Sequence, residues 1–126
     1  MTRNELEAYI AETYNADPEY PWLAYPTYAV FRHQNNHKWF AVVMELPREK
    51  LGLPAGGNID VVNLKCDPLL IGSLRNEPGF FPAYHMSKAH WITAALDGSA
   101  PEDKLKWLLD LSFDLTAGRK KNQAQK

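Results

Sequence analysis

The side chains in this sequence with the most versatile chemistry are four histidines and one cysteine. His33 and His37 flank one short segment, His85 and His90 flank another, and Cys66 lies between the two pairs. No carboxylate stands beside either pair at a recognised metal-ligand spacing, and a lone cysteine forms neither an internal disulfide nor an all-cysteine zinc site. We therefore expect a non-enzymatic protein without metal or cofactor. A cryptic enzyme or metal site would require His85 or His90 to converge with a carboxylate or with Cys66.

Long cations and histidines around the same two segments could bind phosphate. Such side chains donate hydrogen bonds to phosphate oxygens and neutralise charge without reading base sequence. If both segments are hairpin tips, they would contact a duplex on two sides. Because the cations are few, we expect weak and strongly salt-dependent binding of double-stranded DNA. The residues expected to contact DNA are Arg32, Lys38, Lys65, Arg75, His85, Lys88 and His90.

Aromatic side chains near these segments favour a different function. Trp39, Tyr84 and Trp91 would form an aromatic cleft for a protein partner or a small ligand. Aromatic residues on strands also pack in cores, so this cleft is the alternative to DNA binding. Tyr20 and Trp22 lie in a proline-rich segment, and we expect them to cover the core rather than contact a ligand.

The charge distribution bears on the DNA hypothesis. The chain of 126 residues has a formal net charge of −1, which argues against a general polyanion binder. Residues 1–27 carry one base against five acids, whereas residues 28–91 carry seven bases against five acids. Residues 92–126 carry six bases against five acids, including a basic cluster at residues 119–121. The segment that holds both turns is therefore the more basic one.

The elements that must position these residues follow from hydrophobic periodicity and capping signals. Thr2 and Glu5 predict a capping box and a helix to residue 14, and Asp67-Pro68 predicts a second helix start. Ser99-Ala100-Pro101-Glu102 predicts another capping box before the last helix, which would end at Gly118. The expected strands span residues 27–32, 38–46, 58–65, 80–86 and 90–96, with a helical turn at residues 48–51.

Side-chain periodicity assigns faces to these elements. In the second strand, alternation places Trp39, Ala41 and Val43 opposite Phe40, Val42 and Met44. Two sets of helical residues are expected to be buried, namely Leu69, Leu70, Ile71 and Leu74, and then Leu105, Leu108, Leu109, Ser112, Leu115 and Thr116. The predicted class is α+β, with an antiparallel sheet of about five strands, helices on one face, and the order α-βββ-α-ββ-α.

Three blocks of the sequence resemble the MmcQ/YjbR family. They are FRH and KWFA within residues 31–41, NLKCDP at residues 63–68, and PAYHMSKAHWIT at residues 82–93. The resemblance covers about residues 20–117 and implies a small bacterial α+β domain with a frataxin-like (CyaY-like) fold. It also implies DNA binding through two β-hairpins arranged as a double wing. The chain departs from the family at Ser87, where asparagine is usual.

The length and the hydropathy of the chain predict its number of domains and its location. The chain has one domain's worth of residues, and we expect a single domain at residues 1–118 with a basic, frayed tail at residues 119–126. No apolar run approaches the roughly 20 residues that span a bilayer, and the N-terminal residues lack an apolar signal core. We therefore expect a cytoplasmic protein with no membrane partner.

Overall fold

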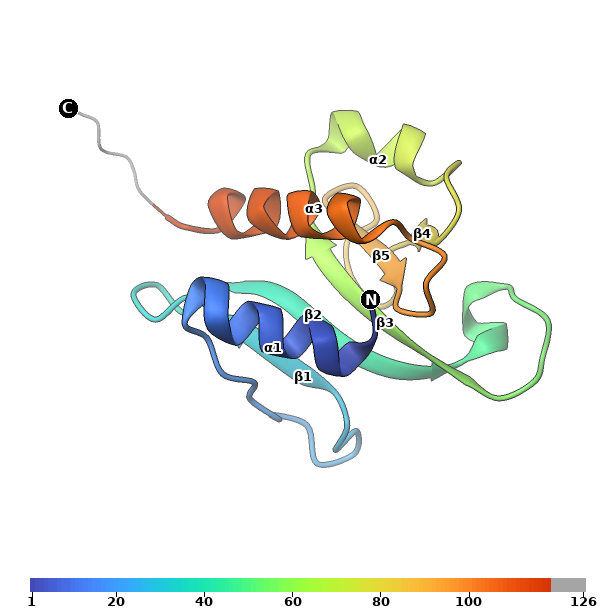
Figure 1. The fold of residues 1–126 in the computed structure, drawn as a ribbon, viewed down its shortest axis with the longest axis horizontal. Coiled ribbons are helices and arrows are strands. Elements are labelled where there is room, and N and C mark those ends of the chain that lie inside the picture. The colour runs from blue at the N-terminus through green and yellow to red at the C-terminus, as the bar shows by residue number, and fades with distance from the viewer. Residues whose placement is uncertain (119–126) are drawn as a thin grey trace.

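The computed structural model describes residues 1–118, which form an α+β fold with a five-stranded antiparallel sheet (Figure 1). The strands lie in the order β1-β2-β3-β5-β4, and the predicted class and element order are confirmed. The expected basic tail at residues 119–126 lies outside the described residues. The elements are α1 (Arg3–Tyr14), β1 (Ala29–Arg32), β2 (Trp39–Pro47), the 3-10 helix η1 (Arg48–Leu51), β3 (Asn58–Lys65), α2 (Pro68–Leu74), β4 (Phe80–Pro82), β5 (Trp91–Ala95) and α3 (Glu102–Leu115).

Local hydrogen bonds start the first two helices as predicted. The Thr2 hydroxyl accepts from the Glu5 amide at 3.2 Å, and the Glu5 carboxylate accepts from the Thr2 amide at 2.8 Å. The Asp67 carboxylate accepts from the Leu69 amide at 2.9 Å and caps α2. These bonds satisfy amides that have no partner within the helix.

The capping box predicted at Ser99 and Glu102 is wrong. Pro101 is the N-cap of α3 and makes no side-chain capping bond. The Ser99 amide donates instead to the Asp97 carboxylate at 3.0 Å, within the preceding turn. A short polar side chain readily forms such a local turn, and here the turn takes the place of the cap. Likewise, Gly118 is not the residue after the C-cap, because α3 ends at a C-cap on Thr116.

The three helices cover one face of the sheet (Figure 1). Phe31, Val43, Leu64 and Ile92 contribute to this core from the strands. Two leucines predicted to be buried are not, since Leu69 is 89% exposed and Leu115 is 47% exposed. Only one side of each helix faces the sheet, and these two residues lie off that side. The buried helical side chains are Leu6, Ile10, Ile71, Leu74, Leu105, Leu108, Leu109 and Ser112.

A bulge in β2 changes the predicted side-chain alternation. Phe31 pairs with Ala41 but Arg32 pairs with Trp39, so Phe40 is the extra residue. Phe40 and Ala41 therefore both lie in the core beneath the helices. Trp39 points to the opposite face, with Val42 and Met44, rather than with Ala41 as the alternation predicted. The bulge thus places a tryptophan on the helix-free face, which we call the open face.

The segment predicted as a strand at residues 80–86 is extended only at residues 80–82. Beyond Pro82 the backbone bonds to side chains instead of to a strand, because the Tyr84 amide donates to the Thr93 hydroxyl at 3.0 Å. His85 then takes a positive φ of 58°, which ends the extended conformation. Residues 83–90 therefore form a loop, which we call the β4–β5 loop, rather than a long hairpin.

The open face has its own hydrophobic cluster, covered by loops rather than helices. Val30, Val42, Met44 and Val61 are among its buried members. The covering side chains belong to the connection between α1 and β1, to the β2–β3 connection and to the β4–β5 loop. They are Trp22, Tyr28, Leu51, Leu53, Tyr84 and Met86. A loop cover leaves more room for a hollow than a packed helix does.

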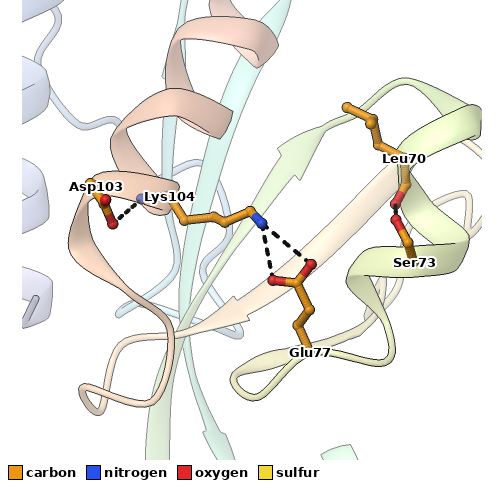
Figure 2. Close-up of polar contacts among 5 residues, drawn as sticks. All are labelled: Leu70, Ser73, Glu77, Asp103 and Lys104. Carbon is orange, nitrogen blue, oxygen red and sulfur yellow. Dashed lines mark hydrogen bonds and ion pairs between the residues drawn. The ribbon is translucent and has the colours of Figure 1, made fainter.

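Polar contacts hold the helical layer to the segment after α2 (Figure 2). Lys104 Nζ of α3 lies 3.0 Å and 3.3 Å from the two carboxylate oxygens of Glu77. The Ser73 hydroxyl donates to the Leu70 carbonyl at 3.2 Å within α2. The Lys104–Glu77 pair is partly exposed, so it orients the segment more than it stabilises the fold. None of the helices within residues 1–118 is long and apolar enough to cross a membrane.

Candidate ligand-binding pocket

Several of the cations expected to contact DNA are engaged within the protein. Arg32 makes a two-pronged ion pair with Glu19, with nitrogen–oxygen distances of 2.7 Å and 2.9 Å. Lys88 Nζ donates to the Ala83 carbonyl at 2.9 Å, inside its own loop. Lys65 Nζ lies 5.7 Å from the centroid of the Trp91 ring. These contacts occupy some of the hydrogen-bond donors and some of the positive charge that would otherwise bind phosphate.

The remaining expected DNA contacts are exposed but dispersed. Lys38, His85 and His90 lie in or beside the two turns, and Arg75 is the C-cap of α2. Both turns leave the same end of the sheet, with Lys65 at the end of β3 between them. DNA binding by these residues stays a prediction.

The two turns do not extend freely from the sheet. In the first, His33 Nε2 lies 3.0 Å from the Phe113 carbonyl and 2.9 Å from the Thr116 hydroxyl, which ties the turn to the end of α3. In the second, Asn63 Nδ2 donates to the Tyr84 carbonyl at 2.8 Å, which draws the β4–β5 loop over the open face. The first turn therefore docks on the helical side of the sheet and the second on the open side.

On the open face, three segments enclose a pocket of about 300 Å³. Strand residues form its floor, the connection between α1 and β1 forms one wall, and the β4–β5 loop forms the other. Such a volume lies at the small end of the usual range for ligand sites. The lining residues are Trp22, Tyr25, Tyr28, Trp39, Val42, Met44, Asn63, Tyr84, His85 and Met86.

The first wall is shaped by consecutive turns. The Tyr25 amide donates to the Trp22 carbonyl at 3.3 Å, and the Tyr28 amide donates to the Tyr25 carbonyl at 3.1 Å. Two backbone bonds between Glu19 and Val30, of 2.8 Å and 2.9 Å, fasten the segment to β1. Aromatic residues at a spacing of three are thereby brought to one side of an otherwise irregular segment.

The aromatic rings meet at well-defined angles. Trp22 lies at 84° to Trp39 with 5.5 Å between centroids, and at 79° to Tyr28 with 6.2 Å between centroids. Tyr25 stacks on Tyr28 with 4.7 Å between centroids and 16° between planes. Edge-to-face and offset-stacked pairs are the arrangements that aromatic side chains prefer. The wall is therefore a packed array of rings with perpendicular faces.

The polar residue in the floor has its hydrogen bonds satisfied. Asn63 is fully buried, and its amide oxygen accepts a short hydrogen bond from the Thr93 hydroxyl while its amide nitrogen donates to Tyr84. Burial and the neighbouring hydroxyls of Tyr84 and Tyr25 raise the pKa of Tyr28, which keeps that phenol neutral. The pocket is thus lined by neutral aromatic and aliphatic groups, with His85 as its one imidazole.

The aromatic cleft predicted from the sequence is only partly assembled. Trp39 and Tyr84 both line the pocket, but Trp91 does not; it is 9% exposed and lies beside Lys65. From the sequence, Trp22 was expected to cover the core, and neither Tyr25 nor Tyr28 was predicted to contact a ligand. The available signal was the spacing of three residues between Trp22, Tyr25 and Tyr28.

Among residues 1–118, neither a metal site nor a nucleophilic pair assembles around Cys66. Within residues 1–118, no three metal-ligating side chains come together. The His90 carbonyl accepts from the Cys66 amide at 2.8 Å, yet the thiol is buried in the core while the imidazole of His90 is exposed. Burial and the nearby Asp67 carboxylate raise the pKa of the thiol, so the reactive thiolate is disfavoured.

Comparisons with known proteins identify relatives over most of the chain. The YjbR family model matches residues 4–115. The chain is 43% identical to "Uncharacterized protein YyaQ" of Bacillus subtilis over 116 residues, which are 92% of this chain and 98% of that protein. It is 40% identical to "Uncharacterized protein YjbR" of Escherichia coli K12 over 57 residues, 44% of this chain and 48% of that protein.

Solved structures agree with the fold described here. A crystal structure of a Pseudomonas syringae protein superposes with a TM-score of 0.90 at 45% identity, over 92% of this chain and 99% of that one. A Deinococcus radiodurans protein superposes with a TM-score of 0.71 at 23% identity, over 98% of this chain and 83% of that one. The second likeness concerns the fold alone.

Proposed function

Because this chain belongs to the YjbR family, whose relatives described above are named as uncharacterized proteins, we propose a function from its own pocket. The protein is a non-catalytic binding module that holds a small organic ligand between aromatic side chains on the open face of its sheet. The observation that carries this proposal is the pocket of about 300 Å³ with five aromatic residues among its ten lining residues.

The construction of the pocket supports ligand binding over simple core packing. Trp39 is placed on the open face by the bulge in β2, and Tyr84 is held over Asn63 by a buried hydrogen bond. A pocket lined by aromatic groups with a few placed polar groups is the usual form of a small-molecule site. Side chains held by packing and hydrogen bonds lose little freedom on binding, which favours affinity.

The lining residues also support binding without catalysis. Acid–base or nucleophilic catalysis needs a titrating group beside a reacting partner. Among the ten lining residues, His85 is the one imidazole, and none is a carboxylate, a serine or a cysteine. The lining therefore offers His85 neither a carboxylate partner nor a serine or cysteine nucleophile for acyl transfer.

The test is a titration of isotope-labelled protein with a panel of small organic fragments, followed by NMR. The chain has four tryptophans, whose indole N–H signals report on separate places. We expect saturable shifts at Trp22 and Trp39, which line the pocket, but not at Trp107, which is 51% exposed on α3.

Two variants sharpen this titration. Tyr25→Ala removes a half-exposed ring of the pocket and should weaken fragment binding by about tenfold, since buried aromatic contacts carry much of such affinity. Trp107→Ala removes a comparably exposed ring on α3 and should leave binding unchanged. Fragments that saturate no signal, or that shift Trp107 as much as Trp39, would refute the proposal.

DNA binding is a second candidate, supported by one observation. Both turns leave the same end of the sheet, and Lys65 lies between them. Anisotropy of a labelled duplex at low and moderate salt tests this candidate. We expect a weak, salt-sensitive signal that a Lys38→Ala/Lys88→Ala variant loses and a Lys50→Ala/Lys106→Ala control keeps, since the control residues lie outside both turns. Equal signals from both variants would exclude the turns as the contact.

A further inference from the structure

Resting on the proposed function, the angles between the aromatic rings point to the class of ligand. We infer that the pocket binds a small organic cation, such as a quaternary ammonium compound, against the faces of Trp22, Trp39 and Tyr28. Three features of the pocket favour such a ligand, namely the corner between the rings, the charge of the lining and the polar groups in the floor.

The corner between the rings suits a compact rather than a flat ligand. Trp22 stands nearly perpendicular to both Trp39 and Tyr28, at 84° and 79°. A planar ligand stacks on one ring face and meets the other rings edge-on. A near-spherical ammonium group contacts several perpendicular faces at once, and each face attracts it because an aromatic ring carries negative charge density there.

The charge of the lining favours a cation over an anion. No Lys or Arg is among the ten lining residues, so a cation meets no fixed like charge and an anion meets no fixed partner. Glu19 of the first wall is paired with Arg32 and does not line the pocket, so a cation would be held by the ring faces alone. Lys88, on the opposite loop, directs its ammonium to the Ala83 carbonyl and does not line the pocket.

The polar groups in the floor do not demand a hydrogen-bonding ligand. The amide of Asn63 is occupied by Thr93 and Tyr84. A quaternary ammonium group has no N–H to donate, so a floor without free acceptors leaves none of its hydrogen bonds unmade. A primary ammonium carries three N–H donors that the floor does not bond, which favours the fully substituted cation.

The decisive experiment compares choline with 3,3-dimethyl-1-butanol, which has the same shape but carbon in place of the charged nitrogen. Calorimetry and the indole N–H signals follow both titrations. We expect choline to bind at least about tenfold more tightly, as desolvated cation–π contacts supply such a preference. Trp39→Leu, which keeps apolar bulk but removes a ring face, should erase that preference, and Trp107→Leu should retain it.

A positive charge added to the pocket lining tests whether charge or shape decides which ligand binds. His85→Lys should weaken choline binding by about tenfold and leave the neutral alcohol unaffected, whereas His37→Lys should affect neither, because His37 has a similar positive φ of 62° but lies outside the pocket lining. If the alcohol binds as well as choline, or if fragments bind the pocket and choline does not, the cation inference fails while the small-ligand proposal stands. If neither choline nor any fragment binds, both fail.

Discussion

At the scale of single residues, Asn63 links the sheet to the pocket. It lies in the middle of β3, opposite Val42 on one side and Thr93 on the other, and it is fully buried. A polar group in this place is tolerated only because both ends of its amide are bonded. Since one of these bonds holds Tyr84, the residue secures a pocket wall as well as the sheet.

Replacing Asn63 with alanine should lower the free energy of unfolding by about 1–3 kcal/mol, because the Tyr84 carbonyl and the Thr93 hydroxyl lose a buried partner. Asn58→Ala, on the same strand, removes an exposed bond to Glu45 and should cost less than about 0.5 kcal/mol. Urea denaturation of both variants measures the difference. Equal losses of unfolding free energy in the two variants would mean that the buried hydrogen bonds of Asn63 stabilise the fold no more than the exposed bond of Asn58.

His33 is another buried polar side chain with specific hydrogen-bond partners. Its Nε2 donates to the Phe113 carbonyl, and its ring lies 4.2 Å from the centroid of the Phe113 ring. Burial lowers the pKa of His33 below its usual value of about 6.5, outweighing the Phe113 bond and the Asp114 charge, which raise it. The unfolded chain therefore takes up this proton at a higher pH than the folded chain does.

Stability should consequently be complete above about pH 6.5 and decline as the pH falls below that value, where protonation favours the unfolded state. His33→Gln should show a smaller loss of unfolding free energy between pH 7.5 and 5.5 than the wild type. His37→Gln, at an exposed position of the same turn, should behave as the wild type. A wild-type-like pH profile in His33→Gln would remove His33 as the cause.

At the scale of elements, two similar sequence patterns lead to different helix starts. Thr2 and Glu5 cap α1 reciprocally, while Ser99 turns back to Asp97 and leaves α3 without a side-chain cap. The helix α3 compensates by burying four residues against the sheet, and its first turn holds Glu102 and Asp103, which favour a helix N-terminus. Packing thus replaces capping for α3.

Thr2→Ala should therefore cost about 0.5–2 kcal/mol of stability, the usual effect of losing a cap. Ser99→Ala should cost less, because it removes only the hydroxyl bond to Asp97 in an exposed turn and keeps the amide bond. Thermal denaturation followed by circular dichroism compares the two. A larger loss for Ser99→Ala than for Thr2→Ala would contradict the assignment of the caps.

At the scale of the whole molecule, the helical layer and the sheet edge meet closely at one glycine. Gly79 precedes β4 with a φ of +87°, and a Cβ there would lie 2.5 Å from the Ala100 amide nitrogen. Its carbonyl accepts from the Ala95 amide at 2.8 Å. The backbone before β4, the end of β5 and the start of the segment leading to α3 therefore share one small space.

Gly79→Ala should destabilise the protein by more than about 2 kcal/mol, because the strained φ and the backbone clash cannot both be relieved. Gly72→Ala is the matched control: it lies inside α2 with nothing within 4 Å of the added methyl group and should stabilise by about 0.5–1 kcal/mol. Chemical denaturation gives both values. If Gly79→Ala has wild-type stability, the backbone at residue 79 moves away from Ala100 without a cost in free energy.

The sequence by itself determined the class and order of the elements. The cap at Thr2, the Asp67-Pro68 start and the alternation of β3 and β5 are local signals, and each acts over a few residues without tertiary help. Local patterns led to wrong predictions at Phe40, where the alternation of β2 is interrupted, and at residues 83–86, which were expected to be a strand. There the outcome depends on a register shift against β1 and on bonds to Asn63 and Thr93, which are distant in sequence.

The candidate site was decided by tertiary structure. The sequence suggested Trp39 and Tyr84 as neighbours, but Trp91 at the end of β5 pairs with Lys65 and lies outside the pocket. Trp22 and its tyrosine neighbours reached the pocket because the Glu19–Val30 bridge fixes an irregular segment against the sheet edge. Pairings of this kind depend on which backbone groups meet in space, and no local pattern of residues encodes that meeting.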